Sequence, residues 1–357
     1  MARTPSPDII EPTRPPAAAV SGTRSHTLLS GLIASLRPSQ WTKNLIIFAG
    51  VLFGQRLTDT GALAAAAGAF VTFCLLSGVV YLINDVVDRD ADRRHPVKRG
   101  RPIASGAVPL SAALTAAALL GAVALAAAFA LRPEFDFVAL LYVGLLSLYS
   151  GRLKHIVIID VLTIAIGFVL RAVGGAVVIP VAVSVWLYML TILLALFLAL
   201  AKRRHELVLL ADGATGHRRI LQEYSPYLLD QMISVVTAST LVAYAIYTVS
   251  PETTAKFQTH WLGVTLPFPL YGIFRYLYLV HQKEGGGSPS DMLLTDRPLL
   301  ICVALWAAAV ALITPSSCQG VVELPGKKKC QEMLTLSAVS ASFARTSWYP
   351  ARFMTEW

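Results

Sequence analysis

Charged residues are scarce in this chain of 357 residues. Lys, Arg, Asp and Glu together make up 14% of it, whereas soluble domains carry about 25%. Hydrophobic residues make up 55%, and the mean hydropathy is +0.62. This composition excludes a disordered protein, an ordinary soluble enzyme and a basic nucleic-acid-binding domain. It indicates a polytopic membrane protein of about one large helical domain.

Cysteine is also rare. The four cysteines form no CxxC motif and no cluster with histidine, which excludes a disulfide scaffold and a zinc module. No apolar stretch follows the early arginines, so residues 1–27 do not form a secretory signal. Their Pro, Ala, Ser and Thr content predicts a disordered cytoplasmic tail. Residues 315–357 lack a helical period, and we assign this atypical C-terminal tail no function.

Long apolar runs, in contrast, are abundant. A helix needs about 20 apolar residues to cross the bilayer core, and an open sheet would leave its edge groups unpaired in lipid. The sequence therefore predicts an all-α membrane bundle of nine transmembrane helices. The nine segments are 42–59, 62–87, 108–131, 136–151, 157–178, 183–201, 231–250, 260–280 and 297–314.

Basic residues are unevenly divided between the two sets of connecting loops. The loops after the second, fourth, sixth and eighth segments hold most of them, whereas the opposite loops contain only Arg56, Arg132 and Lys256. Short basic loops remain on the cytoplasmic side of a membrane. We therefore expect a multi-pass plasma membrane protein with a cytoplasmic N-terminus and, with nine spans, an external C-terminus.

Three aspartates, here called the acidic cluster, end the second segment. Asp85, Asp88 and Asp92 are spaced i, i+3, i+7, so on a helix they fall within about 60° of one face. Carboxylates so close repel one another unless a cation lies between them, and Mg²⁺ binds carboxylate and phosphate oxygens. Because Arg89, Arg93 and Arg94 are near, a solvated, salt-bridged helix end is the simpler alternative.

A basic loop, 93–106, follows the acidic cluster. It contains His95, Lys98, Arg99 and Arg101 among prolines and glycines. Beside a metal site, such cations favour the binding of a diphosphate ester. An anchor for anionic lipid is the alternative, and different residues of the loop can serve either role.

The pattern Asn84-Asp85-x-x-Asp88-x-x-x-Asp92, with the basic loop and Arg101-Pro102-Ile103-Ala104-Ser105-Gly106 after it, resembles the UbiA superfamily of intramembrane prenyltransferases. The resemblance implies a nine-helix catalytic domain over 28–314, with a central cavity open to lipid. It also implies Mg²⁺ as cofactor, with Asn84 and the acidic cluster as its ligands and the three aspartates as catalytic residues.

Further motifs resemble one branch of the superfamily, whose members transfer phosphoribose from phosphoribosyl diphosphate to a polyprenyl phosphate in cell-wall arabinose-donor synthesis. Prenyl-diphosphate users commonly carry a second Asp pair, but here Asp160 is alone and Ile164 stands where its partner would be. The matching motifs are Arg37-Pro38-x-Gln40-Trp41-x-Lys43-Asn44, Tyr81-Leu-x-Asn84-Asp85-Val86, His95-Pro96-x-Lys98-Arg99, Leu153-Lys154-His155, Arg171-Ala172 with Gly174-Gly175, and Ala201-Lys202-Arg203 with Glu206-Leu207.

Charge and position divide the remaining candidate residues between the two substrates that the resemblance implies. The expected donor-binding residues are Asn84, Lys98, Arg101, Lys202 and Arg203. The expected polyprenyl-phosphate-binding residues are Lys43, Arg152, Lys154, His155, Asp160 and Arg171. For Lys43, anchoring at the interface is an even alternative, whereas Arg171 lies within a span, where a charge by default faces a cavity or partner.

Two other functions compete with this one. The first is prenyl transfer from a prenyl diphosphate to an aromatic acceptor in quinone synthesis, against which the missing second Asp and the Lys154-His155 pair argue. The second is a cation-coupled lipid transporter. That class needs ionisable groups at mid-span, whereas here they gather at one membrane face, and no inverted repeat is evident.

Overall fold

The computed structural model describes residues 27–95, 98–181, 184–211, 223–282, 292 and 295–314. These ranges contain helices and no strand, and six of the helices are long and apolar enough to cross a membrane. The predicted all-α membrane class is therefore confirmed. Apart from Thr27, both predicted tails, 1–27 and 315–357, lie outside the described residues.

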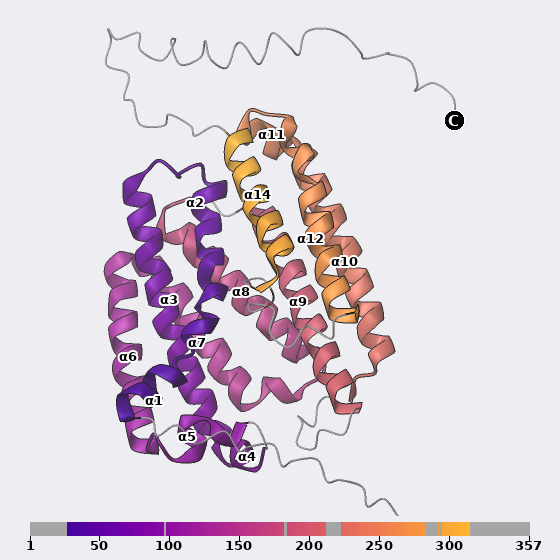
Figure 1. The fold of residues 1–357 in the computed structure, drawn as a ribbon. Helices are drawn as coiled ribbons and strands as arrows, with labels where there is room; N and C mark the ends of the chain where they lie inside the picture. Colours follow the sequence, from indigo (N-terminus) through magenta and orange to yellow (C-terminus); the bar gives the residue numbers. More distant parts are fainter. Residues whose placement is uncertain are drawn as a thin grey trace, which may run out of the picture. The chain divides into compact units, whose positions relative to one another are not determined.

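The six long helices are α3 (Thr60–Val87), α6 (Leu110–Leu131), α7 (Pro133–Gly151), α8 (Ile159–Val178), α9 (Val185–Ala211) and α10 (Pro226–Val249). The shorter α-helices are α1 (Leu28–Ser35), α2 (Ala49–Phe53), α4 (Arg89–Arg94), α5 (Pro102–Ser105), α11 (Pro251–Phe257), α12 (Pro267–Gln282) and α14 (Arg297–Ile313). The 3₁₀ helices are η1 (Pro38–Phe48), η2 (Lys98–Gly100), η3 (Leu153–His155) and η5 (Trp261–Thr265). The helices α1, α4 and α5 lie at one end of the long helices, and α11 lies at the other (Figure 1).

Local sequence signals explain several helix ends. Asp59 caps α3 by accepting a hydrogen bond from the Ala62 N–H, at 3.0 Å. Proline lies in the first turn of α7, α10 and α14, where its missing N–H leaves no intrahelical bond unmade. Asp296 caps α14 in the same way as Asp59 caps α3, through the Leu299 N–H.

The predicted count of nine spans is not confirmed. α12 has 16 residues and α14 has 17, fewer than an upright span needs. The first predicted segment, 42–59, is not one α-helix: η1 occupies 11 residues, α2 adds five, and Gln55 then takes a positive φ of 56°. A 3₁₀ helix rises about 2.0 Å per residue, so η1 covers about 22 Å with few residues.

The 3₁₀ geometry of η1 sorts its side chains into rows, because residues i and i+3 are eclipsed. Asn44 and Ile47 are buried in one row, and Gly50 continues it against α8. The other two rows, one with Gln40, Lys43 and Ile46 and one with Ser39, Thr42 and Leu45, line a cavity. The side chains of η1 therefore pack against α8 on one side and line the cavity on the others.

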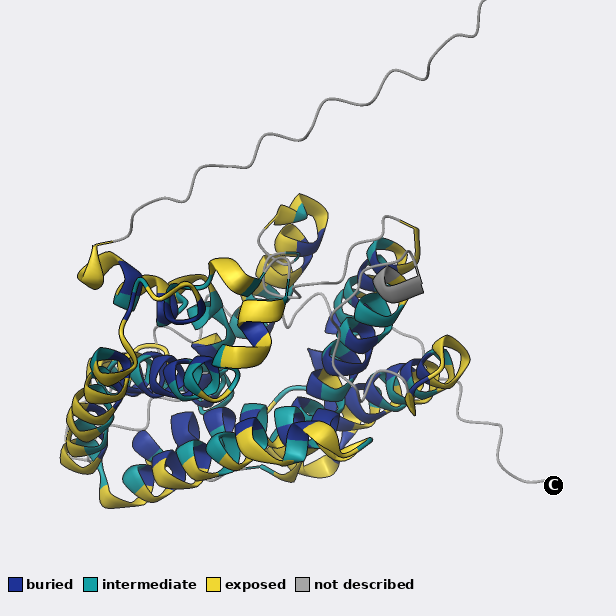
Figure 2. Cartoon of the chain, turned by 90° about the horizontal axis from the view of Figure 1, so that it is seen from below, coloured by how far each residue is buried: buried dark blue, intermediate teal, exposed yellow. Residues whose placement is uncertain are grey.

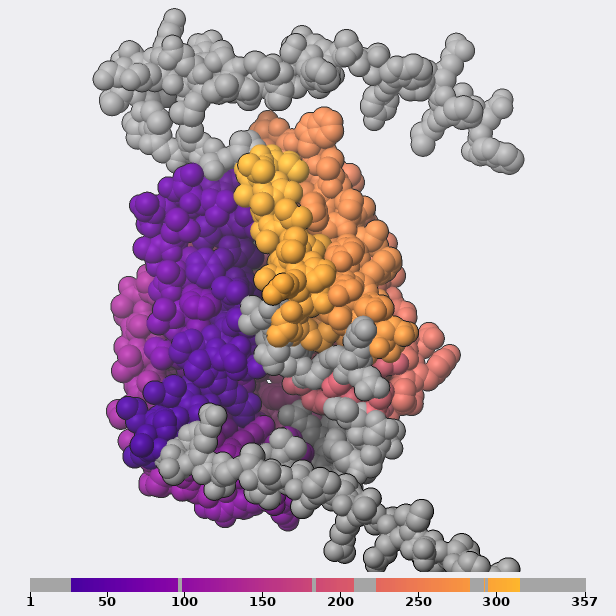
Figure 3. All heavy atoms as spheres, in the orientation of Figure 1, coloured from indigo at the N-terminus to yellow at the C-terminus, as the bar shows by residue number. Residues whose placement is uncertain are grey.

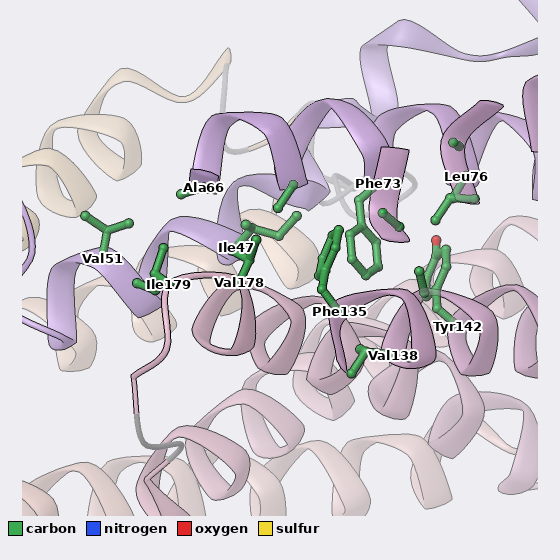
Figure 4. Close-up of a cluster of buried hydrophobic side chains, with 14 of the residues drawn as sticks. Ile47, Val51, Ala66, Phe73, Leu76, Phe135, Val138, Tyr142, Val178 and Ile179 are labelled. Atoms are coloured by element: carbon green, nitrogen blue, oxygen red, sulfur yellow. The ribbon is translucent and has the colours of Figure 1, made fainter. Parts of the chain in front are cut away.

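Buried apolar side chains form separate clusters on the two sides of the cavity. The first joins η1, α3, α7 and α8, where Phe73 packs against the rings of Phe135 and Tyr142 with centroids 5.7 and 5.0 Å apart (Figure 4). The second joins α9, α10 and α12, where Phe197 and Tyr276 meet at 5.3 Å. Exposed residues lie on the outer sides of the helices (Figure 2), as expected where lipid surrounds a bundle.

Gly175 permits the closest helix contact in this arrangement. A Cβ at this position would lie 2.0 Å from the Ile47 carbonyl oxygen, which is backbone and cannot move aside. Gly175→Ala should therefore destabilise the protein by about 1–3 kcal/mol, measured as a lower thermal unfolding midpoint in detergent. Gly144→Ala is the matched control, since nothing lies within 4 Å of its added Cβ. Equal midpoints for the two variants would contradict the contact.

Candidate active site

A cavity of about 1760 Å³ lies between η1, α2 and α8 on one side and α9, α10, α12 and α14 on the other. Figure 3 shows the surface where the purple N-terminal helices and the yellow α14 meet. One end of the cavity is polar, and most of the remaining wall is apolar, with Leu52, Phe53, Leu190 and Leu194. The polar lining at this end includes Arg37, Ser39, Gln40, Lys43, Asn84, Tyr149, Arg171, Lys202 and Arg203, whereas Glu252, Thr253 and Lys256 of α11 line the cavity near the other end of the helices.

The acidic cluster lies at this polar end, behind the cavity lining. Its residues do not share one continuous helix: α3 ends at Val87, Asp88 follows as its C-cap, and α4 begins at Arg89. Asp85 and Asp92 are nevertheless both buried and close, because Arg101 Nη1 donates to Asp85 Oδ1 at 3.1 Å and to Asp92 Oδ2 at 2.6 Å. A guanidinium thus separates the two carboxylates.

Arg37 is a second cation on Asp85. Its Nη2 donates to Asp85 Oδ1 at 2.5 Å, and its guanidinium lies 4.7 Å from the centroid of the Tyr81 ring. The backbone of Arg37 has φ 52° and ψ 64°, a left-handed conformation between α1 and η1. Such conformations are uncommon for residues other than glycine and persist where the surroundings hold them. Asp85 and Tyr81 supply those surroundings here.

Asp88 pairs with a lysine from η3. Lys154 Nζ lies 2.5 Å from Asp88 Oδ1, and Lys154 is buried. Arg152 and His155, which flank it, are exposed and do not line the cavity. The expected polyprenyl-phosphate group of the 152–155 segment is therefore not assembled at the cavity, since the helical turn of η3 directs only Lys154 inward.

Asp160 belongs to a closed network at the start of α8. It is fully buried, with Oδ2 accepting from Arg203 Nε at 2.8 Å and Oδ1 accepting from the Tyr224 hydroxyl at 2.9 Å. Tyr224 in turn accepts the Ile158 N–H at 2.7 Å, where Ile158 has a positive φ of 69°. Burial raises the pKa of Tyr224 to about 12, so this phenol stays protonated and can donate to Asp160.

Arg203 also donates to Glu206 at 2.6 Å and to the Tyr149 hydroxyl at 3.3 Å. The expected donor-binding Arg203 therefore lines the cavity while its guanidinium holds Asp160. Lys202, one residue earlier, lines the cavity too and lies 3.9 Å from Glu206. Lys98 lies in η2 and is not part of the cavity lining.

Arg171 is a buried cation at the cavity wall in the middle of α8. It donates to Asn44 Oδ1 at 2.7 Å, to the Gly167 carbonyl at 3.0 Å and to the Tyr142 hydroxyl at 2.6 Å. The rings of Tyr142 and Phe168 face its guanidinium at 4.7 and 5.1 Å. Within the described ranges, no carboxylate pairs with it, so its positive charge is hydrogen-bonded but not neutralised.

The acidic cluster supplies two of the three carboxylates expected for a metal. Among the described residues, no three His, Cys, Asp or Glu side chains converge to hold an ion, so the predicted three-carboxylate site is not assembled. Asp85 and Asp92 do supply hard oxygens around one positive group, Arg101. Because Mg²⁺ commonly uses one or two carboxylates plus substrate phosphates, this pair fits the ion. Asn84, the fourth expected ligand, lines the cavity beside the pair.

Arg37, Asn44, Tyr81 and Tyr224 were absent from the predicted site residues. The motif that contains Arg37 and Asn44 was visible in the sequence, but their partners Asp85 and Arg171 are 48 and 127 residues away. Tyr224 stands in the connection before α10, and its partner Asp160 is 64 residues away.

The chain belongs to the UbiA prenyltransferase family, whose model matches residues 44–299. It is a multi-pass membrane protein of a transferase family. The resemblance predicted from the acidic cluster is thus confirmed.

Two relatives carry a more specific name. The chain is 33% identical over 296 residues to a decaprenyl-phosphate phosphoribosyltransferase of Mycolicibacterium smegmatis, covering 79% of this chain and 92% of that one. It is 32% identical over 312 residues to one of Mycobacterium tuberculosis, covering 85% and 97%. A UbiA homologue from Archaeoglobus fulgidus, bound to DMAPP and Mg²⁺, has a TM-score of 0.62 at 21% identity, covering 81% of this chain and all of that one. This likeness shows the shared fold.

The Asp160 network makes a testable distinction between neighbouring arginines. Arg203→Met leaves a fully buried carboxylate without its cation, which should reduce the free energy of unfolding by about 3–5 kcal/mol. Arg204→Met removes a half-exposed pair with Asp230, which should cost about 0–1 kcal/mol. Unfolding in mixed micelles compares the two. A similar small loss for both would mean that Arg203 does not hold Asp160.

Proposed function

We propose that this chain transfers phosphoribose from phosphoribosyl diphosphate to a polyprenyl phosphate, of which decaprenyl phosphate is the example, and releases diphosphate. The observation that carries the proposal is the identity of 32–33% with the two phosphoribosyltransferases over most of the chain. The cavity supports it, since a cationic polar end suits two phosphorylated substrates and an apolar wall suits a polyprenyl chain.

In the reaction, the bond between ribose C1 and the diphosphate oxygen breaks, and a phosphate oxygen of the lipid forms the new bond to C1. The sugar is oxocarbenium-like between these events, as in other glycosyl transfers. The attacking oxygen is already anionic, so no general base is needed. The protein's contribution is to orient the two substrates and to neutralise their charges.

Asp85, Asp92 and Asn84 would hold Mg²⁺, with Asp88 at the edge of this group. When bound, the ion would neutralise charge on the departing diphosphate, a contribution of several kcal/mol. Arg101 and Lys202 would contact the diphosphate and the sugar phosphate, with Arg203 fixing the wall beside them. Lys98 would meet the donor only from outside the cavity.

The acceptor phosphate would bind at Arg171 and Lys43, which line the cavity. Arg171 suits this role because it lacks a carboxylate partner within the described ranges and so attracts an anion without first losing an ion pair. Of the other residues expected at this site, Lys154 and Asp160 support the wall through Asp88 and Arg203. Arg152 and His155 remain outside it.

An assay with labelled phosphoribosyl diphosphate and polyprenyl phosphate in detergent tests the function. We expect labelled lipid to form only with Mg²⁺. Asp92→Asn should reduce the rate about 100-fold or more, since loss of several kcal/mol of charge stabilisation has that effect. Asp90→Asn, a change at a side chain with 86% exposure on the same helix, should retain activity. Prenyl transfer to a hydroxybenzoate without turnover of phosphoribosyl diphosphate would favour the aromatic prenyltransferase instead.

We also propose a plasma membrane location with the N-terminus and the site facing the cytoplasm, from which the soluble donor arrives. In a background with all four native cysteines replaced, Gly100→Cys should react with an impermeant thiol reagent only from the cytoplasmic side. Ala255→Cys, in α11 at the opposite end of the helices, should react only from outside. The reverse labelling pattern would contradict this orientation.

A further inference from the structure

The two arginines on Asp85 differ from their carboxylate partners in exposure. The side chains of Arg37 and Arg101 are each 27% exposed, whereas those of Asp85 and Asp92 are 3% and 6% exposed. The carboxylates are therefore buried, whereas both guanidinium groups are partly exposed; of the two arginines, Arg37 lines the cavity and Arg101 does not. Asp88 and Lys154 show the opposite order, 24% against 6%, so there the cation is the fixed partner.

We infer that Arg37 and Arg101 exchange partners during binding: they neutralise Asp85 and Asp92 in the free protein and turn to the diphosphate oxygens when metal and diphosphate arrive together. This rests on the proposed function. It adds Arg37 to the residues that contact the donor, and it makes the binding of the two ligands cooperative.

The charges explain why neither ligand binds well alone. A divalent cation alone must displace guanidinium groups that already satisfy the carboxylates, and those groups then repel it. A diphosphate alone would draw the arginines away and leave two buried carboxylates unpaired, which is strongly unfavourable. With both ligands present, the metal compensates the carboxylates and the arginines meet phosphate oxygens in the bidentate geometry that suits them.

The position of Arg37 supports the exchange. It lines the cavity, whereas Asp85 does not, so its guanidinium already lies between the buried carboxylate and the space for a ligand. Its left-handed backbone joins α1 to η1, and the contacts with Asp85 and Tyr81 hold it there. A diphosphate in the cavity offers this arginine a second anion without movement of either helix.

Two titrations on purified protein in detergent test the inference. The first measures binding of Mn²⁺ alone by electron paramagnetic resonance. The second measures binding of inorganic diphosphate at saturating Mg²⁺ by calorimetry. Arg101→Met should bind Mn²⁺ about tenfold more tightly than the wild type and diphosphate about tenfold more weakly, within the range usual for coupled sites. Arg37→Met should show the same two changes. Because Arg101 still pairs with both carboxylates in this variant, it can be measured even if Arg101→Met fails to fold.

Arg94→Met is the matched control, because Arg94 is exposed in the same segment and, among the described residues, forms no ion pair. It should change neither titration. Weaker or unchanged Mn²⁺ binding in folded Arg101→Met and Arg37→Met would overturn the exchange. It would mean that the two arginines keep their carboxylate partners when ligands bind. Failure of the wild type to bind diphosphate at saturating Mg²⁺ would instead overturn the proposed function.

Discussion

A charged side chain withdrawn from water needs an opposite charge nearby, and this constraint organises the polar end of the bundle. Asp85, Asp92 and Asp160 are the acidic side chains buried within the described ranges, and each meets an arginine. Their partners come from different parts of the chain, so each ion pair also joins two elements. The same contacts that let these carboxylates be buried therefore join α3 and α4 to the start of α5, and α8 to α9.

The buried ion pairs nevertheless differ in whether a ligand could replace one partner. Asp160 and Arg203 are both almost inaccessible, and Tyr224 closes the network from the other side, so this pair has a structural role. Asp85 and Arg101 are unequal in exposure, and a ligand can replace the more exposed partner. A pair in which both side chains are buried supports the fold, whereas a pair with one partly exposed arginine leaves that arginine able to turn toward a substrate.

Hydropathy was enough to predict the helical class and the approximate ranges of the six long helices, because apolar length is a local property. It did not reveal that η1 is a 3₁₀ helix or that its Ile47 lies directly against Gly175, since hydropathy carries no information on contacts between distant residues. The acidic cluster and its basic neighbours were visible as local motifs. The break at Asp88, the pairing of Lys154 with Asp88 and the outward direction of Arg152 and His155 were not, because they depend on residues far apart in the chain.

Arg171 is the exception among these buried charges, because no carboxylate pairs with it within the described ranges. This difference suits a cavity that binds two different phosphate groups. Its hydrogen bonds go to the neutral oxygens of Asn44, Gly167 and Tyr142, and aromatic rings compensate part of its charge. An anion that approaches Arg171 gains attraction without displacing a carboxylate. An anion that approaches Arg37 or Arg101 must compete with Asp85, and under the proposed exchange it would succeed only when a metal takes over that carboxylate. The polar end of the cavity therefore offers two different positions. Arg171 suits a phosphate without a metal, as in a polyprenyl phosphate, whereas Arg37 and Arg101 would suit a metal-bound diphosphate, as in the proposed donor.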